Sequence, residues 1–326
     1  MGIARRLAAL HWPRFLEERA RRAMAANHGV VLMYHEVLPD DMEAAIWTVV
    51  TESRFRRQME HLRAHYDVVS VDAAVQRVLT PTAKGRPFAV VTFDDGYRGN
   101  LTCALPIMES LGLPFTVFVA TRAIQTGRLH WYDHVILYLL ECGQRGCEIP
   151  TSQGVVRYAP GRSTGSRRWA KINGVLTALK SLSEDERHRI ALALPERANA
   201  PLLAMLSKAE LGSLAASPLV EIGCHTHGHE LLDGLPTPDA RDSILTAQQQ
   251  LTEVLGHPPR HFAYPNGNYN ELTIDLVKEL GFATAFTVQP RLWTHAESLW
   301  EIPRIGVGRF ENQPLFRALV SGALQE

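Results

Sequence analysis

The chain has 326 residues, of which 46% are hydrophobic and 21% are charged, a composition ordinary for a globular protein. Basic and acidic residues are equal at 34 each, which gives no indication of a nucleic-acid-binding surface. The four cysteines lack the spacing of a metal-binding or redox motif, so we expect reduced thiols. No apolar run reaches the roughly 18 residues of a membrane-spanning helix, and the length suits one large domain or two ordinary ones.

Residues 1–29 form a basic, amphipathic segment in which arginines are interspersed with apolar residues such as Leu10 and Phe15. Two interpretations stay open: a helix on an anionic membrane surface, or a solvated helix packed on the domain. Trp12 and Pro13 interrupt any apolar core of a signal peptide. We therefore expect a cytoplasmic protein, with peripheral contact at the inner face of the membrane if this segment binds lipid.

Short β-rich runs alternate with helical stretches along the chain, which predicts an α/β fold with a mostly parallel sheet. In the first part we expect strands over 30–34, 67–71, 88–93 and 115–119, and helices over 55–65, 72–79 and 101–111. In the last part we expect strands over 219–224, 261–264, 283–288 and 301–307, and helices over 239–255 and 272–280. About eight strands at this spacing are typical of a βα barrel.

This alternation stops between about residues 121 and 206, a stretch too long to be a plain loop. We expect helices over 131–140, 169–182 and 184–194, and a hairpin in the Gly-rich stretch that runs through Tyr158. Ser183 and Glu186 fit a capping box for the last helix. The sequence thus predicts a helical insertion beside the active-site face of a barrel over 30–326. Three of its aromatics either stack on sugar rings or fill a core: Trp131, Tyr132 and Trp169.

Two adjacent carboxylates, Asp94 and Asp95, directly follow the apolar strand predicted over 88–93. An Asp-Asp-Gly sequence alone is usually a turn. However, functional residues collect at the carboxyl ends of strands in α/β folds. His225 and His229, four residues apart, follow the strand predicted over 219–224 in the same way.

Two histidines and one carboxylate form a common open zinc site, in which water takes the remaining position. A second carboxylate beside that site is a ready general base. The combination of both motifs therefore predicts a metal-dependent hydrolase.

Four segments together resemble the polysaccharide deacetylases, the NodB-homology or carbohydrate esterase family 4 group. Thr92-Phe93-Asp94-Asp95-Gly96-Tyr97 resembles the first motif of the family, and His225-Thr226-His227-Gly228-His229 its His-Ser/Thr-x-x-His motif. Phe262-Ala263-Tyr264-Pro265-Asn266-Gly267 is similar to the third motif, and Val31-Leu32-Met33-Tyr34-His35-Glu36 to the opening strand of many members. The resemblance covers residues 30–120 and 219–307.

The resemblance implies a distorted (β/α) barrel of the NodB type that removes N-acetyl groups from amino sugars. It assigns Asp94 as the general base, and Asp95, His225 and His229 as ligands of a divalent metal. Zinc suits these ligands, although cobalt, nickel or manganese would also serve. A backbone N–H near Asn266 would help the metal to hold the tetrahedral oxyanion.

Four further residues are expected to contact the substrate. Tyr264 and Pro265 belong to the third motif, while Tyr34 and His35 end the opening strand. For Tyr34 and His35 the alternative is that they simply fill the interior of the barrel.

The chain departs from the family pattern in two places. The arginine that normally pairs with the base is replaced by Ala263, and Arg304 is the replacement we expect, with Arg260 as a second candidate. The late Leu-x-His motif that supplies a general acid has no clear match. His295 has the wrong spacing, and His227 is another candidate.

The leading interpretation is a metal-dependent deacetylase of an N-acetylated sugar in a surface polysaccharide, a lipopolysaccharide or a lipid-linked precursor. N-deformylation of a lipid-linked amino sugar is a close variant. A glycan-binding protein that has lost catalysis is a second class, against which the intact carboxylate pair and both histidines argue. A glycosidase is a third class, but it would have no use for the two histidines.

Overall fold

A computed structural model describes residues 3–10, 12–24, 27–42, 46–80, 85–195 and 203–324. Its centre is a parallel sheet with the strand order β11-β10-β9-β6-β5-β1-β12, and β4 pairs with β5 outside this path. The strands are β1 (Gly29–Tyr34), β4 (Asp67–Val68), β5 (Phe88–Phe93), β6 (Phe115–Val119), β9 (Val220–Cys224), β10 (His261–Ala263), β11 (Thr284–Phe286) and β12 (Ile305–Gly306).

The sheet curls so that its two ends approach each other. Phe286, at the end of β11, forms a parallel bridge with Ile302, shortly before β12, and the backbone N–H of Thr287 donates to the carbonyl of Ile302 at 2.8 Å. Because β12 also pairs with β1 in parallel, the strands curl into the distorted (β/α) barrel that the sequence predicts. The last strands are shorter than expected, since regular pairing covers only 284–286 and 305–306.

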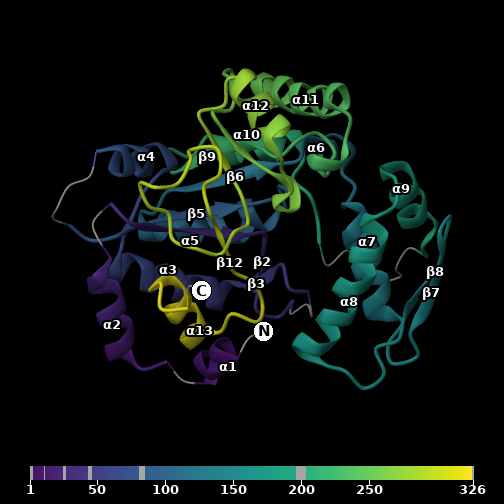
Figure 1. Cartoon of the computed structure of the whole chain (residues 1–326), viewed down its shortest axis with the longest axis horizontal. Coiled ribbons are helices and arrows are strands. Elements are labelled where there is room, and N and C mark those ends of the chain that lie inside the picture. The colour runs from purple at the N-terminus through teal and green to yellow at the C-terminus, as the bar shows by residue number, and fades with distance from the viewer. Residues whose placement is uncertain are drawn as a thin grey trace.

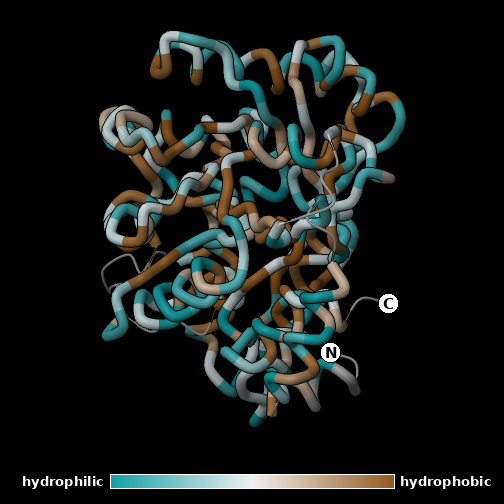
Figure 2. Tube along the Cα trace, turned by 90° about the vertical axis from the view of Figure 1, so that its left-hand side faces the viewer, coloured by the Kyte–Doolittle hydropathy of each residue, from teal (hydrophilic) through white to brown (hydrophobic). Residues whose placement is uncertain are grey.

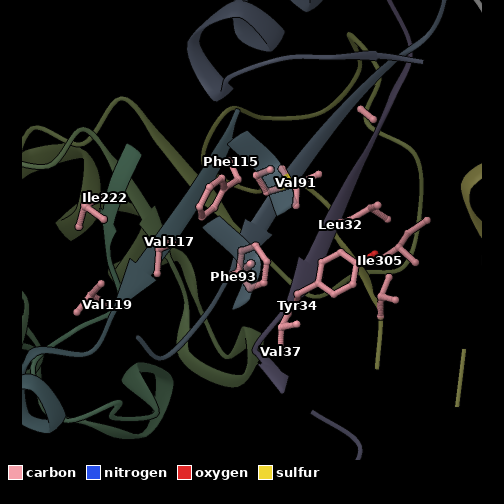
Figure 3. Close-up of a cluster of buried hydrophobic side chains, with 14 of the residues drawn as sticks. Leu32, Tyr34, Val37, Val91, Phe93, Phe115, Val117, Val119, Ile222 and Ile305 are labelled. Carbon is pink, nitrogen blue, oxygen red and sulfur yellow. The ribbon is translucent and has the colours of Figure 1, made fainter. Parts of the chain in front are cut away.

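Apolar side chains that continue from strand to strand explain why these segments form the centre. Every residue of β1, β5 and β6 is buried, as expected for parallel strands covered on both faces. Figure 3 shows part of this core, in which Phe93 and Tyr34 lie among side chains of neighbouring strands. Fully burying a side chain of this size contributes about 1.5–3 kcal/mol.

Helices cover the outside of the barrel (Figure 1). They are α3 (Glu52–His65), α4 (Val71–Leu79), α5 (Leu105–Leu111), α10 (Lys208–Ala215), α11 (Thr237–Leu255), α12 (Glu271–Glu279) and α13 (Gln313–Val320). Local sequence sets several of their ends: Ser70 caps α4, Asn270 forms a capping box on α12, and Gly256 ends α11 in the left-handed conformation. A π-helical turn, η1 (Asn100–Ala104), precedes α5 where the sequence predicted one continuous helix from Leu101.

The stretch after β6 folds beside the barrel, on the right in Figure 1. It contains α6 (Thr121–Thr126), α7 (Trp131–Glu141), the hairpin β7 (Cys147–Thr151) and β8 (Gly154–Tyr158), α8 (Gly165–Lys180) and α9 (Glu184–Ala193). A second hydrophobic cluster holds this insertion together and includes Val49 and Tyr97 of the barrel side. The insertion is therefore packed against the barrel face that carries the carboxylate pair.

The capping box predicted at Ser183 is only half formed. The Ser183 hydroxyl accepts a hydrogen bond from the backbone N–H of Glu186. The Glu186 carboxylate does not return to the cap, because it accepts hydrogen bonds from the backbone and the hydroxyl of Ser152 in the hairpin.

The N-terminal segment forms two helices, α1 (Ile3–Leu10) and α2 (Arg14–Ala23), which lie against the barrel near α13 and α3. The single helix implied by the amphipathic pattern is wrong, because Pro13 precedes α2 and starts a new helix. The packed interpretation agrees with the burial of Glu17, while Leu10 and Phe15 are exposed.

A short parallel pair, β2 (Glu36–Leu38) with β3 (Val49–Thr51), was not predicted.

None of the helices in the described ranges is both long and apolar enough to cross a membrane. In the coloured part of the trace in Figure 2, hydrophobic and hydrophilic stretches alternate at short intervals.

Candidate active site

The two carboxylates sit where β5 ends and the chain turns sharply. The backbone N–H of Asp94 still donates to the carbonyl of Tyr34 on β1, at 3.0 Å, which fixes Asp94 as a continuation of the sheet. Asp95 and Gly96 then adopt positive φ angles of 78° and 84°. An aspartate tolerates this conformation better than most side chains, and the turn brings both carboxylates to the same end of the barrel.

Arg304 forms a bidentate ion pair with Asp94. Its two terminal nitrogens lie 2.7 and 2.8 Å from the two carboxylate oxygens. The Nε of Arg304 donates to the carbonyl of Thr287 at 2.9 Å, and its guanidinium lies over the rings of Phe118 and Phe286. Arg304 has no exposed surface. Arg304, directly before the last strand, thus takes the place of the arginine that the third motif lacks.

His225 and His229 point towards Asp95 from the loop after β9. Their Nε2 atoms lie 3.5 and 3.4 Å from the Asp95 Oδ1. The Nδ1 of His225 lies 2.7 Å from the carbonyl oxygen of Ala263, to which it donates. This bond leaves the Nε2 lone pair of His225 free to face the carboxylate.

Several observations indicate that these three side chains fit a metal ion. Their ligand atoms all lie within 4.8 Å of one another. The Asp95 Oδ1 is buried without a hydrogen-bond partner. A carboxylate with two imidazoles is also the donor set of open zinc sites. The residues present therefore suit a divalent cation.

Charge and burial separate the roles of the two carboxylates. Burial raises the pKa of Asp94, but the Arg304 guanidinium, followed by His225, outweighs burial and holds that pKa below its usual value. For Asp95, burial and then the charges of Asp94 and Asp133 raise the pKa well above its usual value. Asp94 is thus held in its ionised form, whereas a bound cation would stabilise the ionised form of Asp95.

The histidines are held neutral, as metal ligands must be. Burial and then His225 and His130 lower the pKa of His229 well below its usual value. Burial also lowers the pKa of His225, against the opposing effect of Asp94.

The two carboxylates and the two histidines of the site line a cavity of about 400 Å³ between the barrel and the insertion. His35 and Asn266, both predicted site residues, line it as well. Asn266 has a φ of 56° inside the short 3₁₀ turn η3 (Pro265–Gly267). The insertion contributes Trp131, Tyr132, Leu176, Lys180 and Arg187 to the same wall.

A buried polar layer next to His229 was not predicted. His130 stacks on Tyr132 with 5.1 Å between ring centroids, and the His130 ring lies 5.5 Å from that of His229. The Tyr97 hydroxyl lies 2.9 Å from both oxygens of Asp133. The sequence signal for this layer is that His130 and Asp133 stand at the start of α7, an otherwise strongly apolar helix.

The prediction that Tyr34, Tyr264 and Pro265 contact the substrate is wrong, because these side chains lie outside the cavity. Tyr34 is fully buried in the core, with its hydroxyl donating to Gln58 at 3.0 Å. Tyr264 is also fully buried and donates to the carbonyl of Trp300. Pro265 is buried in the turn that shapes Asn266. All three side chains pack in the protein interior next to residues of the site and support the site without contacting the cavity.

The other candidates for the missing arginine and for the general acid lie away from the cavity. Arg260 is half exposed and pairs with Asp72, away from Asp94. The Nδ1 of His227 contacts the hydroxyl of Thr121 at 2.9 Å, and His295 is exposed in a loop. Neither histidine lines the cavity, whereas His35 does.

Several solved structures have a similar fold. Deacetylase PplD from Streptococcus pyogenes, in complex with acetate, is 15% identical, with a TM-score of 0.57 over 86% of this chain and 92% of that one. IcaB from Ammonifex degensii is 19% identical, with a TM-score of 0.57 over 90% and 97%. The BpsB deacetylase domain from Bordetella bronchiseptica is 17% identical, with a TM-score of 0.54 over 86% and 96%. At these identities the likeness concerns the fold. No curated protein matches the chain in sequence.

Fold and site together define a deacetylase-type barrel with its polar residues at the carboxyl ends of the strands. The sequence model of the polysaccharide deacetylase family matches residues 82–285, and the chain belongs to this family. It is accordingly an enzyme that acts on the amide bond of acylated glycans.

Proposed function

We propose that the protein is a divalent-metal-dependent N-deacetylase of an amino sugar in a surface polysaccharide, a lipopolysaccharide or a lipid-linked glycan precursor. The observation that carries this proposal is the convergence of Asp95, His225 and His229 beside the buried Asp94–Arg304 pair. Zinc is the metal that the donor set favours.

Each side chain has a defined task in this mechanism. Asp95, His225 and His229 hold the metal, which when bound polarises the acyl carbonyl and acidifies water. Asp94 accepts the proton of the attacking water, and Arg304 keeps it ionised and oriented. The backbone at Asn266 supports the oxyanion. The acid that protonates the leaving amine stays unassigned, because burial lowers the pKa of His35, the further histidine that lines the cavity, to about 4.

The N-terminal helices support a location at the inner face of the membrane. Leu10 and Phe15 are 82% and 68% exposed, and arginines surround them in the sequence. An apolar tip within a basic helix pair suits an anionic lipid surface. Sedimentation with anionic vesicles tests this, and equal recovery with neutral vesicles would contradict it.

The central experiment compares the wild type with Asp94→Asn. We expect about one zinc per chain in both proteins by elemental analysis. Acetate release from N-acetylated glycans should fall by roughly 10²–10⁴-fold in the variant, because the base is lost while the metal ligands stay. Unchanged acetate release would remove Asp94 as the base. A wild type that holds no metal after incubation with zinc or cobalt would overturn the proposed function.

A further inference from the structure

Two cationic side chains of the insertion face the cavity without a carboxylate partner. Lys180 ends α8 and Arg187 lies on α9, and both line the cavity beside the metal cluster. Among the described residues, neither side chain forms an ion pair. The two carboxylates whose charge acts on Arg187, Glu184 and Glu230, are instead held by Arg122 at 2.5 and 3.4 Å.

Arg187 is the stronger sign of a missing partner. It is 7% exposed, and its Nε is buried without any hydrogen bond. Its guanidinium lies over the ring of Trp131, 5.4 Å from the centroid. The one hydrogen bond that this side chain makes to a described residue is a long contact of 3.5 Å to the Lys180 carbonyl. A buried guanidinium normally satisfies most of its donors, so this one is arranged for a group that enters the cavity.

Lys180 lines the same cavity as Arg187 and the metal cluster, and its charge acts on His229. Its Nζ lies 2.5 Å from the Oδ1 of Asn266. Burial, and then the charge of Arg187, lower the pKa of Lys180, while Lys180 in turn contributes to the lowered pKa of His229. Two like charges held close in a partly buried wall repel each other unless an anion lies between them.

The other charged residues of the cavity already have partners. Asp94 is paired with Arg304, and Asp95 faces the two histidines. Glu311 accepts a hydrogen bond from the backbone N–H of Gly308 at 2.9 Å and faces Arg5. Among the described residues that line the cavity, no carboxylate is left to neutralise Lys180 and Arg187.

We propose that Lys180 and Arg187 form a subsite for an oxyanion, a phosphate or a carboxylate, carried by the amino-sugar substrate next to its N-acetyl group. This rests on the proposed function and narrows its substrate to a charged glycan. Both side chains bind such groups through charge-assisted hydrogen bonds.

The test uses three N-acetylated probes: N-acetylglucosamine 1-phosphate, N-acetylmuramic acid and neutral methyl N-acetylglucosaminide. We expect the zinc-loaded wild type to favour at least one charged probe by about tenfold or more in kcat/KM over the neutral one. A preference for N-acetylglucosamine 1-phosphate identifies phosphate as the recognised group, and a preference for N-acetylmuramic acid identifies carboxylate. The preference should fall towards one in Lys180→Met and Arg187→Met and recover in Lys180→Arg.

Arg189→Met is the matched control, because Arg189 lies on the same helix but is exposed and outside the cavity. Its preference should equal that of the wild type. Equal kcat/KM on charged and neutral probes, or a preference that survives both cavity substitutions, overturns the subsite. Thermal unfolding of each variant checks that it is folded. If Arg187→Met does not fold, the substrate preference of Lys180→Met alone decides whether the subsite exists.

Calorimetric binding separates this inference from the proposed function. If the wild type hydrolyses none of the probes, the proposed function loses support, and binding of the same probes still tests the subsite. A charged probe that binds about tenfold more weakly to Lys180→Met supports it. Equal binding of charged and neutral probes refutes it.

Discussion

The pair of Asp94 and Arg304 shows how one buried contact serves both stability and chemistry. Arg304 has no exposed surface and Asp94 is 3% exposed, and they meet through two short hydrogen bonds. Removing one partner of a buried pair leaves the other charge uncompensated, which costs about 3–5 kcal/mol. The same guanidinium holds the pKa of Asp94 low, so its loss affects the base as well.

We therefore predict that Arg304→Met lowers both the free energy of unfolding and the rate of acetate release. Urea unfolding should show a loss of about 3–5 kcal/mol. The double variant Asp94→Asn with Arg304→Met should recover part of that stability, because no charge is left unpaired, yet stay inactive. Full activity in Arg304→Met would exclude Arg304 from the site.

Tyr34 makes the opposite case, a motif residue with a structural role. Its ring packs against Phe55 and Phe93, and its hydroxyl donates to Gln58. Tyr34→Phe should lower the unfolding free energy by about 0.5–1.5 kcal/mol through the lost hydrogen bond. KM for the glycan should stay unchanged, since the hydroxyl does not reach the cavity. A KM several-fold higher with unaltered stability would restore Tyr34 as a substrate contact.

At the scale of elements, Glu17 ties helix α2 to the barrel. It is 4% exposed, and its carboxylate lies 3.1 Å from the Nε2 of His61 on α3 and 3.7 Å from the Nε of Arg317 on α13. Burial raises the pKa of Glu17, but the hydrogen bond and charge of His61, followed by Arg317, outweigh burial and lower it. The ionised carboxylate is thus the form that stabilises the docked helix.

Glu17→Gln should therefore reduce stability by about 1–3 kcal/mol near neutral pH. A folded-state pKa below the usual 4.5 means that the contribution is present above that value and disappears as pH falls through the lower, folded-state pKa. The stabilities of wild type and variant should then differ down to about pH 4.5 and converge as pH falls below that value. Glu18→Gln, on the exposed side of the same helix, is the control and should change stability by under about 1 kcal/mol. A difference for Glu17→Gln that persists at low pH would argue against an ionic tether.

The elements that sequence predicts well are those whose pattern repeats within a few residues. The strands predicted over 30–34, 88–93 and 115–119 are fully buried, and their bounds match to within one residue. Strand β12 is short and was overestimated, because its pairing depends on β1, far away in the chain.

The residues of the site differ in the same way in how well the sequence predicts them: those in one short motif are predicted, and those that only the fold brings together are not. The Asp94-Asp95 turn and the two histidines are visible because each is local. The layer of His130, Tyr97 and Asp133 escaped prediction because only the packing of the insertion on the barrel brings it next to His229.

At the scale of the whole molecule, the proposed metal links segments that are distant in sequence. Asp95 follows β5, whereas His225 and His229 follow β9, with the whole insertion between them. The buried Asp95 oxygen has no other partner, so the folded chain without metal carries an uncompensated group at its centre. A ligand that binds only the folded state stabilises it, by about 2.7 kcal/mol at 100 times its dissociation constant.

We predict that zinc raises, and a chelator lowers, the midpoint of thermal unfolding by several degrees. His229→Ala should lose most of this zinc response, because one of three protein ligands is gone. His227→Ala is the matched control, since His227 lies in the same loop but contacts Thr121 instead of the cavity. Equal zinc responses in wild type and His229→Ala would place the stabilising metal elsewhere in the molecule. A response lost in both variants would mean that the loop fold, not the ligand, was measured.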